Sequence, residues 1–191
     1  SEKQLQDGKR YITRMLLPYQ HIIFFFLLPL VYFGMLARSF QHIFSRFSLR
    51  MAVELFLIAV HFALLFGVLF AYLPWTSAVA FLIAHFAVVG IYMTLVFAPN
   101  HKGEEILGES EKVTWATQIT STRNVHPSTL IFHIFGGLNY QIEHHLFTDM
   151  PRPHYAKVAP LVKEHCARHG ITYHETTWLG SLREIYLALK T

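Results

Sequence analysis

Three long apolar stretches occupy the first half of the chain and limit the folds that it can adopt. They are Met15–Ala37, Met51–Leu73 and Thr76–Ala98. As helices rising about 1.5 Å per residue, all three are long enough to cross a hydrocarbon core of about 30 Å. Charged residues make up only 15% of the 191 residues, compared with about a quarter in soluble domains. The sequence therefore predicts an all-α membrane protein, in which residues 99–191 form a helical cap outside the bilayer.

The first stretch differs from the other two because it contains Pro18 and Pro29, each of which removes a backbone donor and disrupts a helix locally. Basic residues lie both before this stretch and between it and the second, whereas the connection at Pro74-Trp75 carries no charge. If all three stretches crossed the membrane, these two basic groups would lie on opposite sides, against the positive-inside bias. We therefore predict a re-entrant or interfacial helix pair at residues 15–37. The second and third stretches form a transmembrane hairpin, with the cap on the cytoplasmic side.

The cap reads as a series of shorter helices. Residues 128–147 are predicted to be helical, with a break at Gly136-Gly137. A helix over residues 153–168 is stopped by Gly170, and a last amphipathic helix covers residues 179–189.

Composition restricts the partners. The net charge is +4, but no cluster of Lys and Arg is interleaved with base-stacking aromatics, so nucleic acid is not an expected partner. Anionic lipid headgroups account for the basic balance. The single cysteine, Cys166, excludes an internal disulfide. The 13 histidines outnumber the 12 acidic residues, and this excess suggests metal, haem or proton chemistry.

One segment concentrates histidine in a pattern that suits a metal. Residues 136–147 read G-G-L-N-Y-Q-I-E-H-H-L-F. Residues three and four positions apart share one face of a helix, so Gln141, His144 and His145 project within an arc of about 100°. Imidazole binds iron, copper, zinc and nickel, and these side chains can approach one ion or two neighbouring ones. A histidine pair satisfied by water and backbone explains the same letters without a metal.

The segment resembles the third histidine box of membrane fatty-acyl desaturases, in the subgroup with glutamine in place of the first histidine of the box, typical of front-end and bacterial enzymes. Three further motifs share the resemblance: M-P-R-x-x-Y at Met150–Tyr155, the stretch C-x-x-H-G-x-x-Y at Cys166–Tyr173, and the Asn100-His101 pair that closes the last apolar stretch. The resemblance covers residues 1–191 as the C-terminal half of one desaturase domain.

The resemblance implies two iron ions, held almost wholly by imidazoles on the cytoplasmic side of the membrane. The implied iron ligands are His101, His144 and His145, with the amide of Gln141 at a fourth ligand position. Around them, Asn100 is expected to act through an iron-bound water, and Asn139 and Glu143 to support the ligands. The Glu143 carboxylate is expected to fix the tautomer of a ligating histidine.

The implied activity is oxygen-dependent desaturation of a long acyl chain, carried as acyl-CoA or as an acyl lipid. Electrons would come from a separate haem cytochrome or ferredoxin. The family also needs H-x-x-x-H and H-x-x-H-H boxes upstream, and this chain has neither there. A di-iron site takes on the order of eight protein ligands. We therefore expect the chain to begin within a longer protein and to be inactive alone.

Three other interpretations stay open at this stage. A hydroxylase of the same superfamily uses similar boxes, and a non-catalytic remnant would retain the motifs without the chemistry. A membrane electron carrier would bind haem through His61 and His85, one in each of the two hairpin helices. For these two histidines, an interhelical hydrogen bond is the simpler explanation. The pair His165 and His169 lies at a helix end, where histidines cap free carbonyls.

Overall fold

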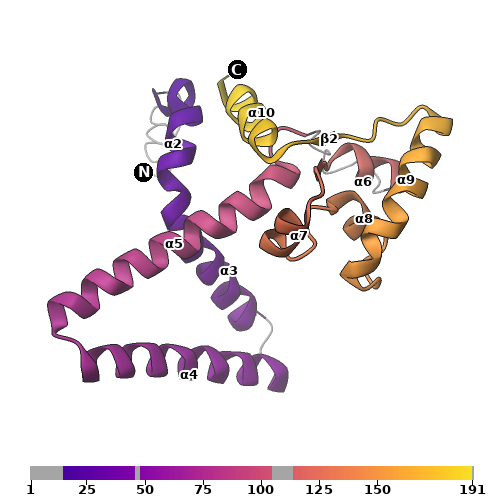
Figure 1. The fold of residues 1–191 in the computed structure, drawn as a ribbon. Helices are drawn as coiled ribbons and strands as arrows, with labels where there is room; N and C mark the ends of the chain where they lie inside the picture. Colours follow the sequence, from indigo (N-terminus) through magenta and orange to yellow (C-terminus); the bar gives the residue numbers. More distant parts are fainter. Residues whose placement is uncertain (1–14, 46–47, 105–113, 191) are drawn as a thin grey trace, which may run out of the picture. The chain divides into compact units, whose positions relative to one another are not determined.

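The structure is a computed structural model that describes residues 15–45, 48–104 and 114–190. Figure 1 shows that most of the described chain is helical. It divides into two compact units, one of residues 26–94 and one that combines the described residues up to Phe25 with residues 95–190. The predicted all-α fold is confirmed. The basic N-terminal residues 1–14, which entered the topology argument, lie outside the described residues.

The first apolar stretch forms a run of helices interrupted at its prolines. The elements are η1 (Leu17–Tyr19), α2 (Gln20–Leu27), η2 (Leu28–Leu30) and α3 (Val31–Ser45). Pro18 and Pro29 each lie in the first turn of a 3-10 helix, where a missing backbone donor costs least. The predicted interruptions are therefore present. The last helix extends past Ala37 to Ser45, and by length and composition the whole run is able to span a membrane. Its re-entrant placement stays a prediction.

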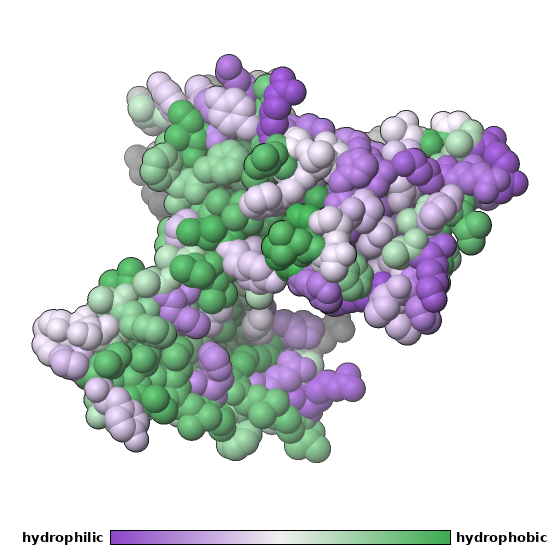
Figure 2. Space-filling view, viewed as in Figure 1, coloured by the Kyte–Doolittle hydropathy of each residue, from purple (hydrophilic) through white to green (hydrophobic). Residues whose placement is uncertain are grey.

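The second and third stretches form α4 (Leu49–Tyr72) and α5 (Trp75–His101), which meet at the predicted turn around Pro74. Ser48 caps α4 by accepting a hydrogen bond from the Met51 backbone N–H at 3.3 Å. Only 6% of the most apolar window of α4 is buried, and Figure 2 shows hydrophobic residues covering the surface of this part. An aqueous protein rarely exposes so large an apolar surface. These helices are long and apolar enough to cross a membrane.

The unit that contains residues 95–190 is built from short helices around two small cores. Besides η1, most of α2 and the end of α5, it contains α6 (Trp115–Thr120), β1 (Asn124–Val125), α7 (Thr129–Phe135), α8 (Gln141–Leu146), η3 (Arg152–His154), α9 (Tyr155–His169), β2 (Glu175–Thr176) and α10 (Trp178–Lys190). One core joins Ile119, Ile142, Val162 and Cys166, so it ties α6, α8 and α9 together. The other core comprises Val96, Val125 and Phe135.

The predicted helix breaks in this unit are confirmed. Gly136 ends α7 with φ of 58°, and Gly137 follows with φ of 83°. Gly170 ends α9 with φ of 67°. Side chains with a Cβ rarely adopt this left-handed conformation, so glycine is favoured at these ends. The short parallel pairing of β1 with β2, Asn124 opposite Glu175, was not predicted. Two residues per strand carry too little periodicity to be read from a sequence.

Candidate metal centre

The last turn of α5 delivers Asn100 and His101 to the site. Asn100 is completely buried, and its amide Nδ2 donates to three acceptors: the Val96 carbonyl at 3.2 Å, the Leu138 carbonyl at 3.0 Å and Gln141 Oε1 at 3.2 Å. These hydrogen bonds join the end of α5 to the start of α8. The adjacent His101 is consequently held next to the histidine-box helix.

The helix α8 is held in place by a buried polar network centred on Asn124. Its Oδ1 accepts from the Ile142 backbone N–H at 2.9 Å, and its Nδ2 donates to Glu143 Oε2 at 2.7 Å and to Tyr173 Oη at 2.6 Å. Tyr173 Oη in turn donates to Glu143 Oε1 at 2.8 Å. Glu143 is completely buried, and this burial raises the pKa of its carboxyl group. Its carboxylate therefore helps to hold α8 in place through these hydrogen bonds.

Three imidazoles from these two helices lie together. The ring centroids of His101 and His145 are 5.2 Å apart, and those of His144 and His145 are 5.8 Å apart. Gln141 Nε2 lies 3.1 Å from His101 Nε2, and its oxygen is already engaged by Asn100. The amide therefore donates to His101 Nε2, which places the ring proton of His101 on Nδ1. The predicted neighbours Gln141, His144 and His145 thus share one site with His101.

The ring of His144 is oriented by a residue to which the motif analysis gave no role. His144 Nδ1 lies 3.1 Å from Tyr155 Oη, at the start of α9. This contact leaves His144 Nε2 available for another partner. Burial lowers the pKa of both His144 and His145, with the Arg152 charge as a further cause for His144 and His144 itself for His145. Both imidazoles are therefore favoured in the neutral form, which is the form that binds metals.

The two residues expected to support the ligands, Asn139 and Glu143, make hydrogen bonds to residues other than the candidate ligands. Asn139 is buried, and its Nδ2 donates to the Val125 carbonyl at 3.4 Å. Glu143 bonds to Asn124 and Tyr173, so Tyr155 is the residue bonded to a candidate ligand in its place. The sequence offered one sign of this role, because Tyr155 closes the M-P-R-x-x-Y motif.

The donor set fits a metal ion. Asn100 Oδ1 and Asn139 Oδ1 are buried and have no hydrogen-bond partner among the described residues. Buried amide oxygens are normally satisfied, and a water or ion is a common reason for an exception. Since Asn100 adjoins His101 and contacts Gln141, a metal-bound water next to it would satisfy its oxygen. Neutral imidazoles and a buried acceptor are a suitable environment for iron.

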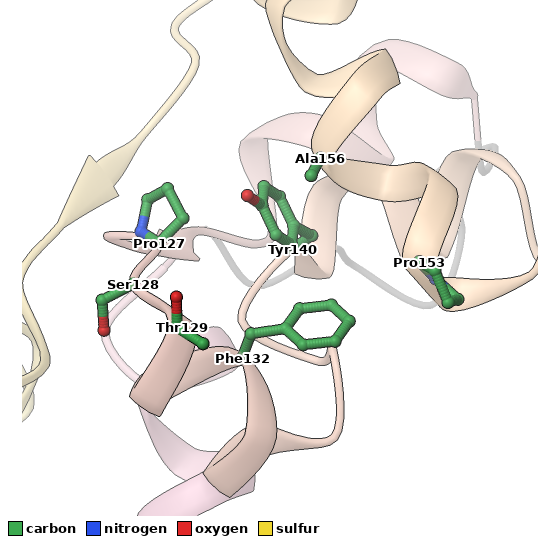
Figure 3. A pocket seen from close by; sticks show the side chains of 7 residues that line it. All are labelled: Pro127, Ser128, Thr129, Phe132, Tyr140, Pro153 and Ala156. Atoms are coloured by element: carbon green, nitrogen blue, oxygen red, sulfur yellow. The ribbon is translucent and has the colours of Figure 1, made fainter.

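Two cavities of about 420 Å³ adjoin the site helix without containing a candidate ligand. The first is lined by residues of α7 and its preceding loop, by Tyr140 just before α8, and by Pro153 and Ala156 at the start of α9, and Figure 3 shows Tyr140 and Phe132 among its walls. The second is apolar, and its lining includes Leu146 and Phe147, the two residues that follow the histidine pair in the sequence. It is lined by Trp115, Ile119, Leu146, Phe147, Val158, Leu161, Val162 and His165.

The pair His165 and His169 behaves as the simpler explanation predicted, whereas among the described residues no hydrogen bond joins His61 to His85, as had been expected for that pair. His169 Nδ1 lies 2.9 Å from the His165 carbonyl, so His169 caps the end of α9. Within the hairpin, the ring of His61 contacts Phe62, and that of His85 contacts Phe81 and Phe86. These rings therefore pack against phenylalanines of the membrane helices.

Comparisons with known proteins agree on one class, the fatty acid desaturases. The family model for fatty acid desaturases matches residues 6–177. The human protein Fatty acid desaturase 3 is 33% identical over 198 residues, covering 99% of this chain and 42% of that protein. The Delta(6)-fatty-acid desaturase fat-3 of Caenorhabditis elegans is 33% identical over 168 residues, covering 83% of this chain and 38% of that protein.

A shorter match reaches higher identity. Fatty acid desaturase 3 of Bos taurus is 46% identical over 91 residues, which cover 48% of this chain. No solved structure matches the chain. The chain belongs to the fatty acid desaturase family. It spans less than half the length of the relatives that it matches.

Proposed function

We propose that this chain supplies one face of a di-iron centre in an enzyme that desaturates long-chain fatty acyl groups. One observation carries the proposal: His101 from the end of α5 lies beside His144 and His145 of α8, with the rings of His101 and His145 centred 5.2 Å apart. Family membership supports the same reaction class.

The ligands in this proposal are His101, His144 and His145. Gln141 lies in the same site, but its amide donates to His101 Nε2 and must rotate or move before that nitrogen binds a metal. The free Oδ1 of Asn100 would accept from an iron-bound water. At these ring separations the imidazoles could bind one ion or be divided between two, which in two-metal sites lie about 3.5–4 Å apart. The remaining ligands would come from histidine boxes upstream of this chain.

The iron centre would supply the oxidising chemistry, while the protein supplies ligands, orientation and a dry path for the acyl chain. The overall reaction is balanced by an external donor. Two hydrogens leave adjacent methylenes, one dioxygen is reduced to two waters, and the donor provides two electrons and the solvent two protons. A haem cytochrome or a ferredoxin is the proposed donor, and acyl-CoA or an acyl lipid the proposed substrate. The active site is proposed to face the cytoplasm, on the side of the basic loops.

The test uses the complete protein in membranes, with and without His144→Ala or His145→Ala. Both variants should lose bound iron and desaturated product while still inserting into the membrane. His165→Ala is the matched control, since this histidine is not a proposed ligand and its ring packs against that of His169 on α9. Full activity in either site variant would refute the ligand assignment. A product with an alcohol in place of a double bond would identify a hydroxylase. A Soret band in a protein without non-haem iron would identify a haem carrier.

A further inference from the structure

Arg123 closes the end of the helix that carries His101. The last carbonyls of a helix have no partner within it and need donors from elsewhere. Arg123 supplies three: its backbone N–H donates to the Asn100 carbonyl at 3.0 Å, its Nε to the Pro99 carbonyl at 2.5 Å, and its Nη2 to the Lys102 carbonyl. These carbonyls belong to residues on both sides of His101. One residue, through two side-chain donors and its backbone N–H, therefore holds the backbone from which His101 projects.

The guanidinium of Arg123 is itself anchored. Only 1% of its side chain is exposed, and a charge buried so deeply must be paired. Its Nη1 lies 2.9 Å from Glu104 Oε1 and 2.5 Å from Glu184 Oε2. Because Glu184 lies on α10, the arginine connects that helix to the end of α5. A planar group with five N–H donors in a rigid fork suits this arrangement, whereas a lysine ammonium is a single point charge.

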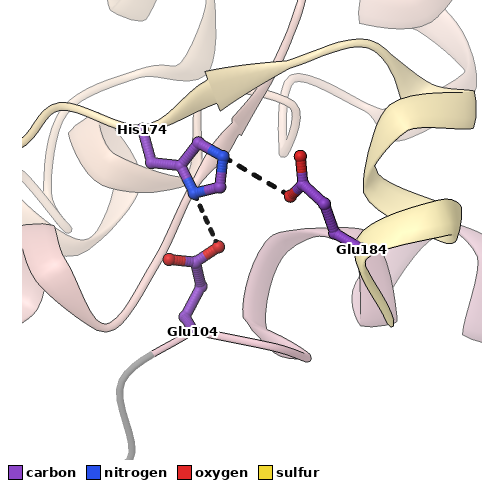
Figure 4. Close-up of side chains that lie close together, drawn as sticks. All are labelled: Glu104, His174 and Glu184. Carbon is purple, nitrogen blue, oxygen red and sulfur yellow. Dashed lines mark ion pairs between the residues drawn. The ribbon is translucent and has the colours of Figure 1, made fainter. Parts of the chain in front are cut away.

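The same carboxylates lie close to His174, and the cluster resembles a metal site. Figure 4 shows the His174 ring between the two carboxylates, 2.8 Å from Glu104 and 3.4 Å from Glu184. Among the described residues, this is the only group of three His, Cys, Asp or Glu side chains whose ligand atoms all lie within 4.8 Å of one another. However, Arg123 Nη1 already contacts both carboxylates. A divalent ion would therefore have to displace a buried cation, so the cluster is an ion-pair network.

We propose that Arg123, anchored by Glu104 and Glu184, is a positioning residue for the iron site. It sets the end of α5 and thereby the distance of His101 from His145. The proposal rests on the di-iron function proposed above. Arg123 does not touch the candidate ligand atoms and acts only through the backbone on either side of His101.

The test compares Arg123→Lys and Arg123→Leu with two controls in the complete protein. Arg183→Leu removes an exposed arginine next to Glu184 on the same helix. Ile185→Ala truncates a completely buried side chain of α10 and gives a variant of lowered stability with the network intact. Three quantities are measured: the iron affinity, the Mössbauer spectrum of the bound iron, and hydrogen exchange at residues 99–104 in the metal-free protein.

Both Arg123 variants should bind iron roughly 10- to 100-fold more weakly, as is usual when a group that orients a ligand is removed. Any iron that remains should have an altered spectrum, and residues 99–104 should exchange faster. Arg183→Leu and Ile185→Ala should keep the wild-type spectrum and affinity. The proposal is overturned if Arg123→Leu retains the wild-type spectrum and iron affinity. It is also overturned if Ile185→Ala, at the same unfolding temperature as Arg123→Leu, loses as much iron as that variant. A wild-type protein without iron would instead refute the di-iron function, and hydrogen exchange would still decide whether Arg123 orders the end of α5.

Discussion

The phenolic oxygen of Tyr155 lies 3.1 Å from Nδ1 of His144, across the junction between α8 and α9. Histidines that bind metals usually bond their second ring nitrogen to a fixed partner, which sets the tautomer and the ring orientation. Tyr155 is buried, with 1% of its surface exposed, and its contact with His144 is partly buried. The relationship gives the M-P-R-x-x-Y motif a physical role next to the histidine box.

Tyr155→Phe is expected to weaken iron binding by roughly 10-fold or more, because His144 loses the partner that orients its ring. The free energy of unfolding should fall by only about 1 kcal/mol, since one hydrogen bond is removed and the ring is kept. Iron titration and thermal unfolding of the complete protein measure the two effects. Tyr186→Phe on α10 is the control, and it should leave iron affinity unchanged. Equal iron affinity in wild type and Tyr155→Phe would exclude an orienting role.

Asn124→Ala is expected to destabilise the fold by roughly 1–3 kcal/mol or more, because the buried Glu143 Oε2 and the Ile142 backbone N–H lose the partner that Asn124 supplies, while Tyr173 keeps only its bond to Glu143. Since this network holds α8, the variant should also lose iron. Thermal unfolding and iron content are the measurements. Asn124→Asp tests the cause: it keeps the shape but places a second carboxylate beside Glu143, and it should be no better than alanine. A stable Asn124→Ala protein with full iron content would contradict this prediction.

Gly137→Ala is expected to cost about 1–2 kcal/mol of stability, because φ at this position is 83° and a Cβ is strained in the left-handed region. The added carbon would also lie 3.0 Å from Cβ of Arg152. Because Gly137 precedes the histidine box, desaturation should fall together with stability. Gly34→Ala is the matched control, since its Cβ would meet nothing within 4 Å. Comparable thermal stability of the two alanine variants would show that the break does not need glycine.

Gly90→Ala tests the packing of the apolar helices. A Cβ there would lie 2.3 Å from the backbone oxygen of Pro29, which cannot move without shifting η2. Overpacking of this kind typically costs about 1–3 kcal/mol. Gly67→Ala, on α4 with nothing within 4 Å, should be neutral or stabilising. Thermal unfolding in detergent compares the stability of the two variants. A Gly90→Ala protein as stable as the wild type would show that η2 does not approach α5 so closely.

Local features of the fold were predictable because they depend on neighbouring residues. The prolines at positions 18 and 29 mark the two 3-10 turns, and Gly136-Gly137 marks the break before α8. The apolar stretch ends at Ala37, but the helix that it forms does not end there, because α3 continues to Ser45. A helix end depends on where its backbone groups find partners, which polarity alone does not determine.

The sequence by itself determined the apolar helices, the glycine breaks and the placing of Gln141, His144 and His145 on one short helix, since all of these follow from spacing along the chain. Only the tertiary structure decided which residues hold that helix in position and how His101 meets it. His101 and Gln141 are 40 positions apart, and Arg123 and Glu184 are 61 apart. Such contacts depend on how helices pack and on which buried polar groups can satisfy one another, and no local pattern of residues records either.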